Sequence, residues 1–252
     1  MTVYYLAESA VFFTIAVVYA FPLGFFCLFL AVQITLDAIV CLFLILKQKF
    51  FYLVKTGKPL SSVNLASKIT LFRITMIPSV LFLIIALRTY PVGPVLALFI
   101  GLTCLSDLFD GYISRRRGEE TFIGKILDSS SDYLLLGVVA IAYYFYRLLP
   151  AWLFWLILSR LLLHSLGMMV LFLLRRKLVP QTTIFGKIAV AATMVLFVYK
   201  PAAVIFPLMK SGTAFVEICS GVLIALSLVD KGIYLTRGIA LNLAERQNRF
   251  PK

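Results

Sequence analysis

The sequence predicts an all-α protein, a polytopic helical bundle that spans a membrane. Of its 252 residues, 62% are hydrophobic and only 14% are charged, whereas a soluble domain carries roughly 25% charged residues. A water-soluble fold of this size could not bury so much apolar surface, and a disordered chain would have more charge and fewer aromatic residues. The apolar stretches are continuous and do not alternate with a period of two, so they favour helices over a transmembrane barrel.

The net charge of +13 would indicate nucleic-acid binding in a soluble protein. In a membrane protein, Lys and Arg collect in the cytoplasmic loops, which explains the charge without a nucleic-acid partner. The four cysteines lie in apolar segments and form no Cys-x-x-Cys pair. They therefore predict neither a zinc site nor a disulfide framework.

The first apolar stretch, residues 9–46, would be about 57 Å long as a single helix, too long for one span of a hydrocarbon core of about 30 Å. Pro22 and Gly24 provide a break, so residues 1–46 are predicted to form a transmembrane hairpin. A hairpin leaves the N-terminus in the cytoplasm, whereas a single span would leave it outside, and the charge rule does not decide between them. This segment contains no Lys or Arg, so it offers no basic region of a cleavable signal peptide. The expected helices cover about 4–20 and 25–46.

The rest of the chain divides into three parts. Residues 47–69 are rich in lysine and form an expected interfacial basic linker. Residues 70–236 form the expected core, and residues 237–252 a basic cytoplasmic tail. Six spans are predicted in the core, at about 70–88, 92–114, 124–147, 151–174, 183–207 and 213–236.

The charges of the loops orient these spans. The stretches 47–73, 115–125, 175–187 and 237–252 hold 18 of the 24 Lys and Arg residues, which places them on the cytoplasmic side. Aromatic residues gather at the other ends of the spans and predict an interfacial anchoring belt. The protein is thus expected to be a multi-pass integral membrane protein embedded among membrane lipids.

Four of the 11 acidic residues lie within 26 positions, at the expected cytoplasmic ends of two consecutive spans: Asp107, Asp110, Asp128 and Asp132. Spacings of three and four put each pair on one helical face, and two helices joined by a short loop are expected to be antiparallel neighbours. Four carboxylates near lipid repel each other, so a cation is needed among them. Oxygen ligands and the near absence of histidine favour Mg²⁺ or Mn²⁺, one ion or two, over zinc.

The neighbouring residues suit a phosphate ligand. Gly111 and Gly124 would let a bulky ligand approach the backbone, although helix packing explains a membrane glycine equally well. Arg115 follows Asp107 by eight residues and so lies near the same face, where its fork could bind a pyrophosphate oxygen. Arg116 and Arg117 are interpreted as topology signals.

The string from Asp107 to Asp132 resembles the signature of the CDP-alcohol phosphatidyltransferases, D-x2-D-G-x2-A-R-x8-G-x3-D-x3-D. Every spacing agrees, and the one departure is Ser114, where the family usually has alanine. The resemblance extends to Asn64, to the run from Thr70 to Arg73 with Pro78, and to Pro180 with Gly186 and Lys187. It leaves residues 1–46 outside.

The resemblance implies a six-helix core with a cytoplasm-facing polar cavity, where a CDP-linked lipid donor is cleaved at its pyrophosphate. The phosphatidyl group passes to a polar alcohol acceptor, and CMP is released. It implies that Asp107, Asp110, Asp128 and Asp132 hold two divalent ions, and that Asp132 is also the general base. It further implies that Gly111, Ser114, Arg115 and Gly124 line the CDP site.

The acceptor is less defined. Asp128-Ser129 resembles the members that use inositol phosphate, whereas the run from Thr70 to Arg73 resembles those that use glycerol phosphate. Arg73, Arg160 and Lys187 could bind an acceptor phosphate, and a structural role explains Arg160 equally well. Two alternatives stay open at this stage, a CDP-choline or CDP-ethanolamine:diacylglycerol phosphotransferase and, less favoured, a divalent cation transporter. The oligomeric state is also open, with a homodimer among the options.

Overall fold

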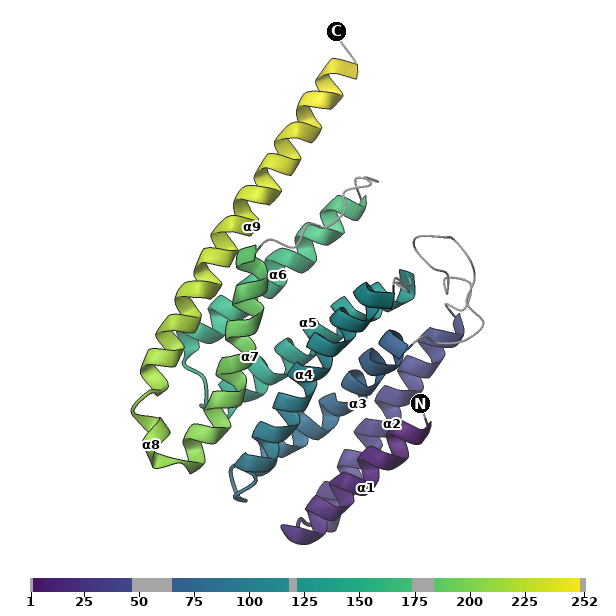
Figure 1. The fold of residues 1–252 in the computed structure, drawn as a ribbon, viewed down its shortest axis with the longest axis vertical. Coiled ribbons are helices and arrows are strands. Elements are labelled where there is room, and N and C mark those ends of the chain that lie inside the picture. Colours follow the sequence, from purple (N-terminus) through teal and green to yellow (C-terminus); the bar gives the residue numbers. More distant parts are fainter. Residues whose placement is uncertain (1, 47–64, 118–121, 174–183, 250–252) are drawn as a thin grey trace.

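The computed structural model describes residues 2–46, 65–117, 122–173 and 184–249, and within them every regular element is a helix (Figure 1). The all-α fold class is confirmed. The helices are α1 (Thr2–Val18), α2 (Leu23–Leu46), α3 (Leu65–Ala86), α4 (Gly93–Arg117), α5 (Phe122–Phe145), α6 (Ala151–Leu173), α7 (Ile184–Ile205), α8 (Pro207–Lys210) and α9 (Thr213–Arg249).

Helices α1 and α2 form the expected hairpin, with the chain reversing between residues 19 and 22. Ala20 adopts a φ of 52°, and the Phe21 N–H donates to the Ala16 carbonyl at 2.8 Å. This is a left-handed helix stop with a six-to-one hydrogen bond, followed by Pro22, which cannot continue the helix. Arg147, with a φ of 57°, ends α5 in the same way, three residues before Pro150.

Helix α3 is the central element of the first half of the bundle, because it packs against α1, α2, α4 and α5. Within its apolar span 78% of the residues are buried, against 11% for α2. The sequence predicted that α4 and α5 are direct neighbours. In the described residues they instead make few direct contacts, because each packs on α3. The second half of the bundle is built on α9, which packs against α6 and α7.

Two predicted boundaries differ from the structure. Helix α3 begins at Leu65, so the last residues of the predicted linker 47–69 are helical, while residues 47–64 lie outside the described part. Helix α9 continues through Arg249, so most of the predicted tail 237–252 extends the last helix. In Figure 1 this yellow helix projects well beyond its neighbours.

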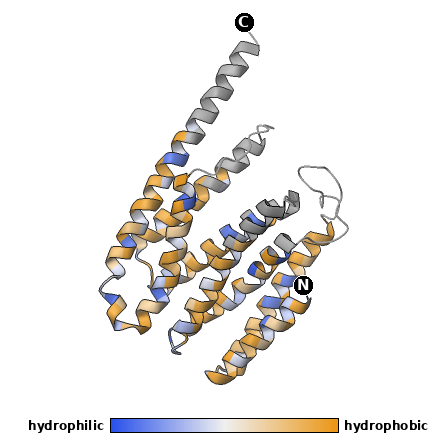
Figure 2. Cartoon of the chain, viewed as in Figure 1, coloured by the Kyte–Doolittle hydropathy of each residue, from blue (hydrophilic) through white to orange (hydrophobic). Residues whose placement is uncertain are grey.

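The helices are apolar over most of their length (Figure 2). Four of those described are long and apolar enough to cross a membrane, namely α2, α3, α7 and α9. Among the described residues the apolar parts of α1, α4, α5 and α6 are shorter. The aspartates lie in the last turns of α4 and in the first half of α5.

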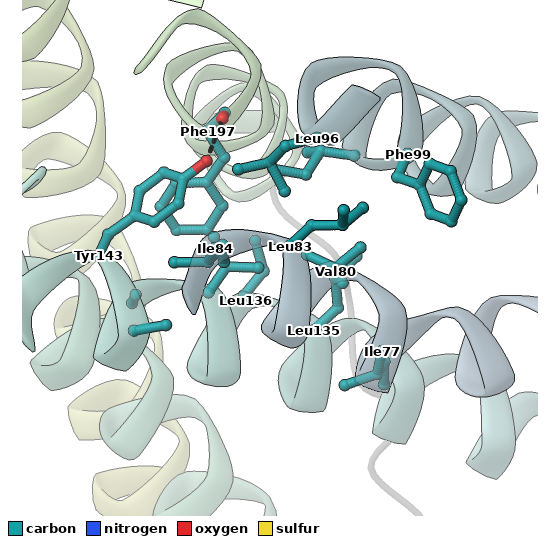
Figure 3. Packing of buried hydrophobic residues seen from close by; sticks show 14 of the residues in the cluster. Ile77, Val80, Leu83, Ile84, Leu96, Phe99, Leu135, Leu136, Tyr143 and Phe197 are labelled. Atoms are coloured by element: carbon teal, nitrogen blue, oxygen red, sulfur yellow. Dashed lines mark hydrogen bonds between the residues drawn. The ribbon is translucent and has the colours of Figure 1, made fainter. Parts of the chain in front are cut away.

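A buried tyrosine compensates for a proline in the core. Pro201 lies inside α7 and has no N–H to donate to the Phe197 carbonyl four residues earlier. The Tyr143 hydroxyl of α5, which is fully buried, donates to that carbonyl at 2.7 Å (Figure 3). The bond satisfies both groups and fixes the height of α5 against α7.

We therefore expect Tyr143→Phe to lower the stability by about 1 kcal/mol, because a buried carbonyl loses its donor. Thermal unfolding in detergent measures this change. In a Pro201→Ala background the backbone N–H returns, so the same substitution should cost clearly less. An equal cost in both backgrounds would show that the proline does not create the need for Tyr143.

Candidate active site

A buried arginine joins α3 to the aspartates of α5. Arg73 is 1% exposed, and its Nη2 lies 2.6 Å from Asp128 Oδ1 and its Nη1 3.0 Å from Asp132 Oδ1. The four-residue spacing places both carboxylates on the same face of α5. A planar fork with several donors suits two carboxylates held one turn apart.

Ser131 completes this cluster from the same turn of α5. Its Oγ accepts from Arg73 Nη2 at 2.6 Å and from Nε at 3.1 Å, and it donates to the Asp128 carbonyl at 2.8 Å. Ser131 is fully buried. The sequence reading overlooked it, although a serine between two aspartates at helical spacing is a usable signal.

This arrangement corrects one premise of the sequence analysis. The sequence predicts that a metal ion supplies the positive charge among the aspartates. The structure shows that the Arg73 guanidinium also contacts two of them, Asp128 and Asp132. The predicted role of Arg73 in acceptor binding stays a prediction. Carboxylate oxygens are also the ligands that a divalent cation prefers, so a metal ion beside Arg73 stays a prediction.

The α4 half of the site is described at the level of the backbone. Asp107 and Asp110 lie in the last turns of α4, and their side chains, like those of Gly111, Ser114 and Arg115, lie outside the described residues. On α5, Gly124 lies one turn before Asp128. Among the described side chains there is no group of three or more acidic, histidine or cysteine residues that could hold a metal.

A second buried arginine joins the other half of the bundle. Arg160 of α6 is 6% exposed; its Nε donates to Ser227 Oγ of α9 at 3.2 Å and its Nη2 to the Gly186 carbonyl of α7 at 2.8 Å. Lys187, the next residue along α7, is exposed. The contacts of Arg160 therefore support the structural alternative, and its role in acceptor binding stays a prediction.

A further basic residue lies near Arg160 on α9. Lys231 is one helical turn beyond Ser227, which accepts from Arg160 Nε. The sequence analysis assigned no role to Lys231. An additional lysine inside an apolar helix is the signal that could have identified it.

The described cavities lie away from these residues. One of about 560 Å³ is found at the opposite end of α5 and is lined by Arg147, Lys200 and Glu217 among others. Lys200 and Glu217 form an ion pair between α7 and α9. None of the aspartates or of the predicted acceptor-binding residues lines this cavity.

Fold and site together define a helical membrane protein that gathers aspartates and buried arginines toward one end of the bundle. The chain belongs to the CDP-alcohol phosphatidyltransferase family, whose sequence model matches residues 63–229. It is an integral membrane protein and a phosphotransferase of phospholipid synthesis. Family membership favours this class over the cation transporter.

Individual relatives point the same way. A CDP-diacylglycerol–glycerol-3-phosphate 3-phosphatidyltransferase of Aquifex aeolicus is 29% identical over 192 residues, which cover 72% of this chain and 99% of the relative. The protein of that name from Bacillus subtilis is 36% identical over 110 residues, 38% of this chain and 56% of its own length. A probable phosphatidylglycerophosphate synthase of Mycobacterium tuberculosis is 35% identical over 123 residues, 47% of this chain and 57% of its own length.

We expect Arg73→Lys to reduce turnover by about 10- to 100-fold, because a lysine cannot serve two carboxylates and a serine together and each charge-assisted hydrogen bond is worth about 1.5–3 kcal/mol. CMP release by purified protein measures this loss. Arg88→Lys is the matched control, since Arg88 is exposed just beyond the other end of α3. Equal activity of the two variants would refute a role of Arg73 in organising the site.

Proposed function

We propose that this enzyme transfers the phosphatidyl group of CDP-diacylglycerol to glycerol 3-phosphate and releases CMP. The observation that carries the proposal is the pair of aspartates on α5 held on one face by Arg73, within the signature spacing of the family. The choice of donor and acceptor is supported by the printed names of the relatives from Aquifex aeolicus and Bacillus subtilis.

The aspartates offer a suitable donor set for divalent cations. The Asp128 and Asp132 side chains are 44% and 26% exposed, so solutes can reach them despite the ion pairs with Arg73, and carboxylate oxygens are the ligands that Mg²⁺ prefers. Asp107, Asp110, Asp128 and Asp132 would hold Mg²⁺ or Mn²⁺, as two ions in our proposal. These ions would neutralise the pyrophosphate of the donor.

In the proposed reaction Asp132 is the general base. It takes the proton of the acceptor hydroxyl, whose oxygen forms a bond to the phosphorus of the phosphatidyl group. The bond between that phosphorus and the bridging pyrophosphate oxygen breaks, and CMP leaves with the electron pair. Arg73 orients the Asp132 carboxylate for this proton transfer. Gly111, Ser114, Arg115 and Gly124 would line the CDP site.

The acceptor phosphate would bind to the basic residues of the second half. Lys231 lies one helical turn beyond Ser227, which accepts from Arg160 Nε, and Lys187 follows Gly186, whose carbonyl accepts from Arg160 Nη2. A dianionic phosphate between such cations gains charge-assisted hydrogen bonds that a neutral alcohol cannot form. This feature favours glycerol 3-phosphate, or another phosphorylated alcohol, over the diacylglycerol acceptor of the choline and ethanolamine phosphotransferases.

The loops on the side of the aspartates hold most of the basic residues, so we propose that the site faces the cytoplasm. An assay of CMP release with a panel of donors and acceptors tests the reaction. Release that requires CDP-diacylglycerol and glycerol 3-phosphate together is the expected result. Release with CDP-choline and diacylglycerol instead would identify the alternative phosphotransferase.

Removal of divalent metal is expected to abolish activity. Treatment with EDTA followed by assay in metal-free buffer should stop CMP release, and either Mg²⁺ or Mn²⁺ should restore it, because the ions would neutralise the pyrophosphate of the donor. Full turnover in metal-free buffer would end this part of the proposal.

Asp132→Asn is expected to lower turnover by about 10²–10⁴-fold while CDP-diacylglycerol binding remains measurable, since the amide is nearly isosteric but cannot accept the proton. Asp107→Asn is the comparison, because the loss of a proposed metal ligand should weaken binding of the donor as well as turnover. Titration of both variants with the donor, with and without Mg²⁺, separates the two roles. Near-normal turnover of Asp132→Asn would show that another group is the base.

A further inference from the structure

The hairpin of α1 and α2 lies outside the family match, which begins at residue 63, yet it is packed on α3. We propose that this hairpin holds α3 in the position in which Arg73 meets Asp128 and Asp132, and that Glu8 is a positioning residue for the site. The inference rests on the proposed function for its catalytic meaning, but the geometry that carries it involves only this chain.

Glu8 forms a buried polar junction of three helices. It is 4% exposed, and its Oε1 accepts from Ser79 Oγ of α3 at 2.8 Å. Its Oε2 accepts from Gln33 Nε2 of α2 at 3.3 Å, and the same amide donates to the Thr75 carbonyl of α3 at 3.2 Å. The junction therefore fixes both helices of the hairpin to the turns of α3 that follow Arg73.

Hydrophobic contact alone explains why the hairpin packs on α3, but it does not explain why the hairpin carries Glu8 and Gln33. The rings of Phe12 and Phe29 stack with centroids 3.7 Å apart, and both contact Phe82 of α3. A carboxylate in an apolar helix is costly, and an apolar side chain would pack at least as well. A buried polar group that is satisfied in only one register is a known means of fixing register between helices.

The hairpin also takes part in a buried cluster next to the Arg73 site. Val40 of α2, 8% exposed, belongs to this cluster with Leu71 and Ile74 of α3 and Leu127 of α5. Leu71 and Ile74 lie close to Arg73 along α3, and Leu127 immediately precedes Asp128. The hairpin thus shares one apolar cluster with both helices that carry the Arg73 contacts.

The geometry leaves little freedom for α3. One residue of helix corresponds to about 1.5 Å of rise and 100° of rotation, and Arg73 holds its two carboxylates at 2.6 and 3.0 Å. A small shift or rotation of α3 would break one of these contacts. The hairpin on one face of α3 and α5 on another prevent such a movement.

The first test measures metal binding. Mn²⁺ is titrated into purified protein and free Mn²⁺ is followed by electron paramagnetic resonance. We expect Glu8→Ala to weaken binding about tenfold, as the loss of supporting residues around metal ligands does, and Glu8→Gln, which keeps an acceptor for Ser79, to restore much of it. Unchanged Mn²⁺ affinity in Glu8→Ala, with only the unfolding temperature lowered, would overturn the inference.

A pair of neighbouring substitutions keeps the test valid if Glu8→Ala does not fold. Val40→Ala removes a side chain of the buried cluster that includes Leu71 and Leu127, whereas Ile39→Ala changes its neighbour, which is 60% exposed. Weaker Mn²⁺ binding in Val40→Ala alone supports the inference, and the same affinity in both variants contradicts it.

A second readout needs neither metal nor activity. Glu8→Ala and Ser131→Ala are combined, and thermal unfolding is measured for the single and double variants. These residues lie on α1 and α5, which share no extensive contact in the described residues, so independent effects would add. Non-additive effects support coupling through α3 and additive effects refute it, even if the wild type releases no CMP and the proposed function falls.

Discussion

The contact of Arg73 with Asp128 and Asp132 is the interaction on which the rest of the structure depends. It is a buried charge that would be costly without partners, and its partners are two of the four aspartates in the family signature. The requirement fixes α3 against α5 at one height. Because α3 also contacts α1, α2 and α4, that height determines how most of the first half is assembled.

Polar contacts have a special role in this bundle because lipid competes with apolar packing. Hydrocarbon tails contact leucine and phenylalanine as well as another helix does, so apolar surfaces alone fix register weakly. Here Arg160, Tyr143 and Glu8 each connect helices through a carbonyl or a polar side chain. Tyr143 connects the two halves through α5 and α7, whereas the contacts of Glu8 lie within the first half and those of Arg160 within the second.

The sequence was sufficient for the fold class, for the hairpin at Pro22 and for the family, because these depend on composition, helix breakers and a fixed spacing. The sequence was not sufficient to place α3 between α4 and α5. A short loop indicates that two helices lie near each other, but it does not indicate whether a third helix packs between them. Arg73 was assigned to the acceptor because its distance from Asp128 along the chain conceals their contact. The roles of Glu8 and Gln33 could not be predicted, because a single polar residue in an apolar helix does not indicate which residue it will contact. The roles predicted for Asp107, Asp110 and Arg115 remain predictions.

The pairing of Arg73 with α5 has a consequence for biosynthesis. Arg73 enters the membrane with α3, whereas Asp128 and Asp132 are synthesised more than 50 residues later. An arginine at the centre of a helix costs about 2.5–3.5 kcal/mol to insert on biological scales. Arg73 is only the ninth residue of α3, close enough to the interface for its long side chain to reach the headgroups. The nascent chain can thus hold this charge in water or among lipid phosphates until α5 emerges, and the site closes only when the guanidinium exchanges those partners for the aspartates.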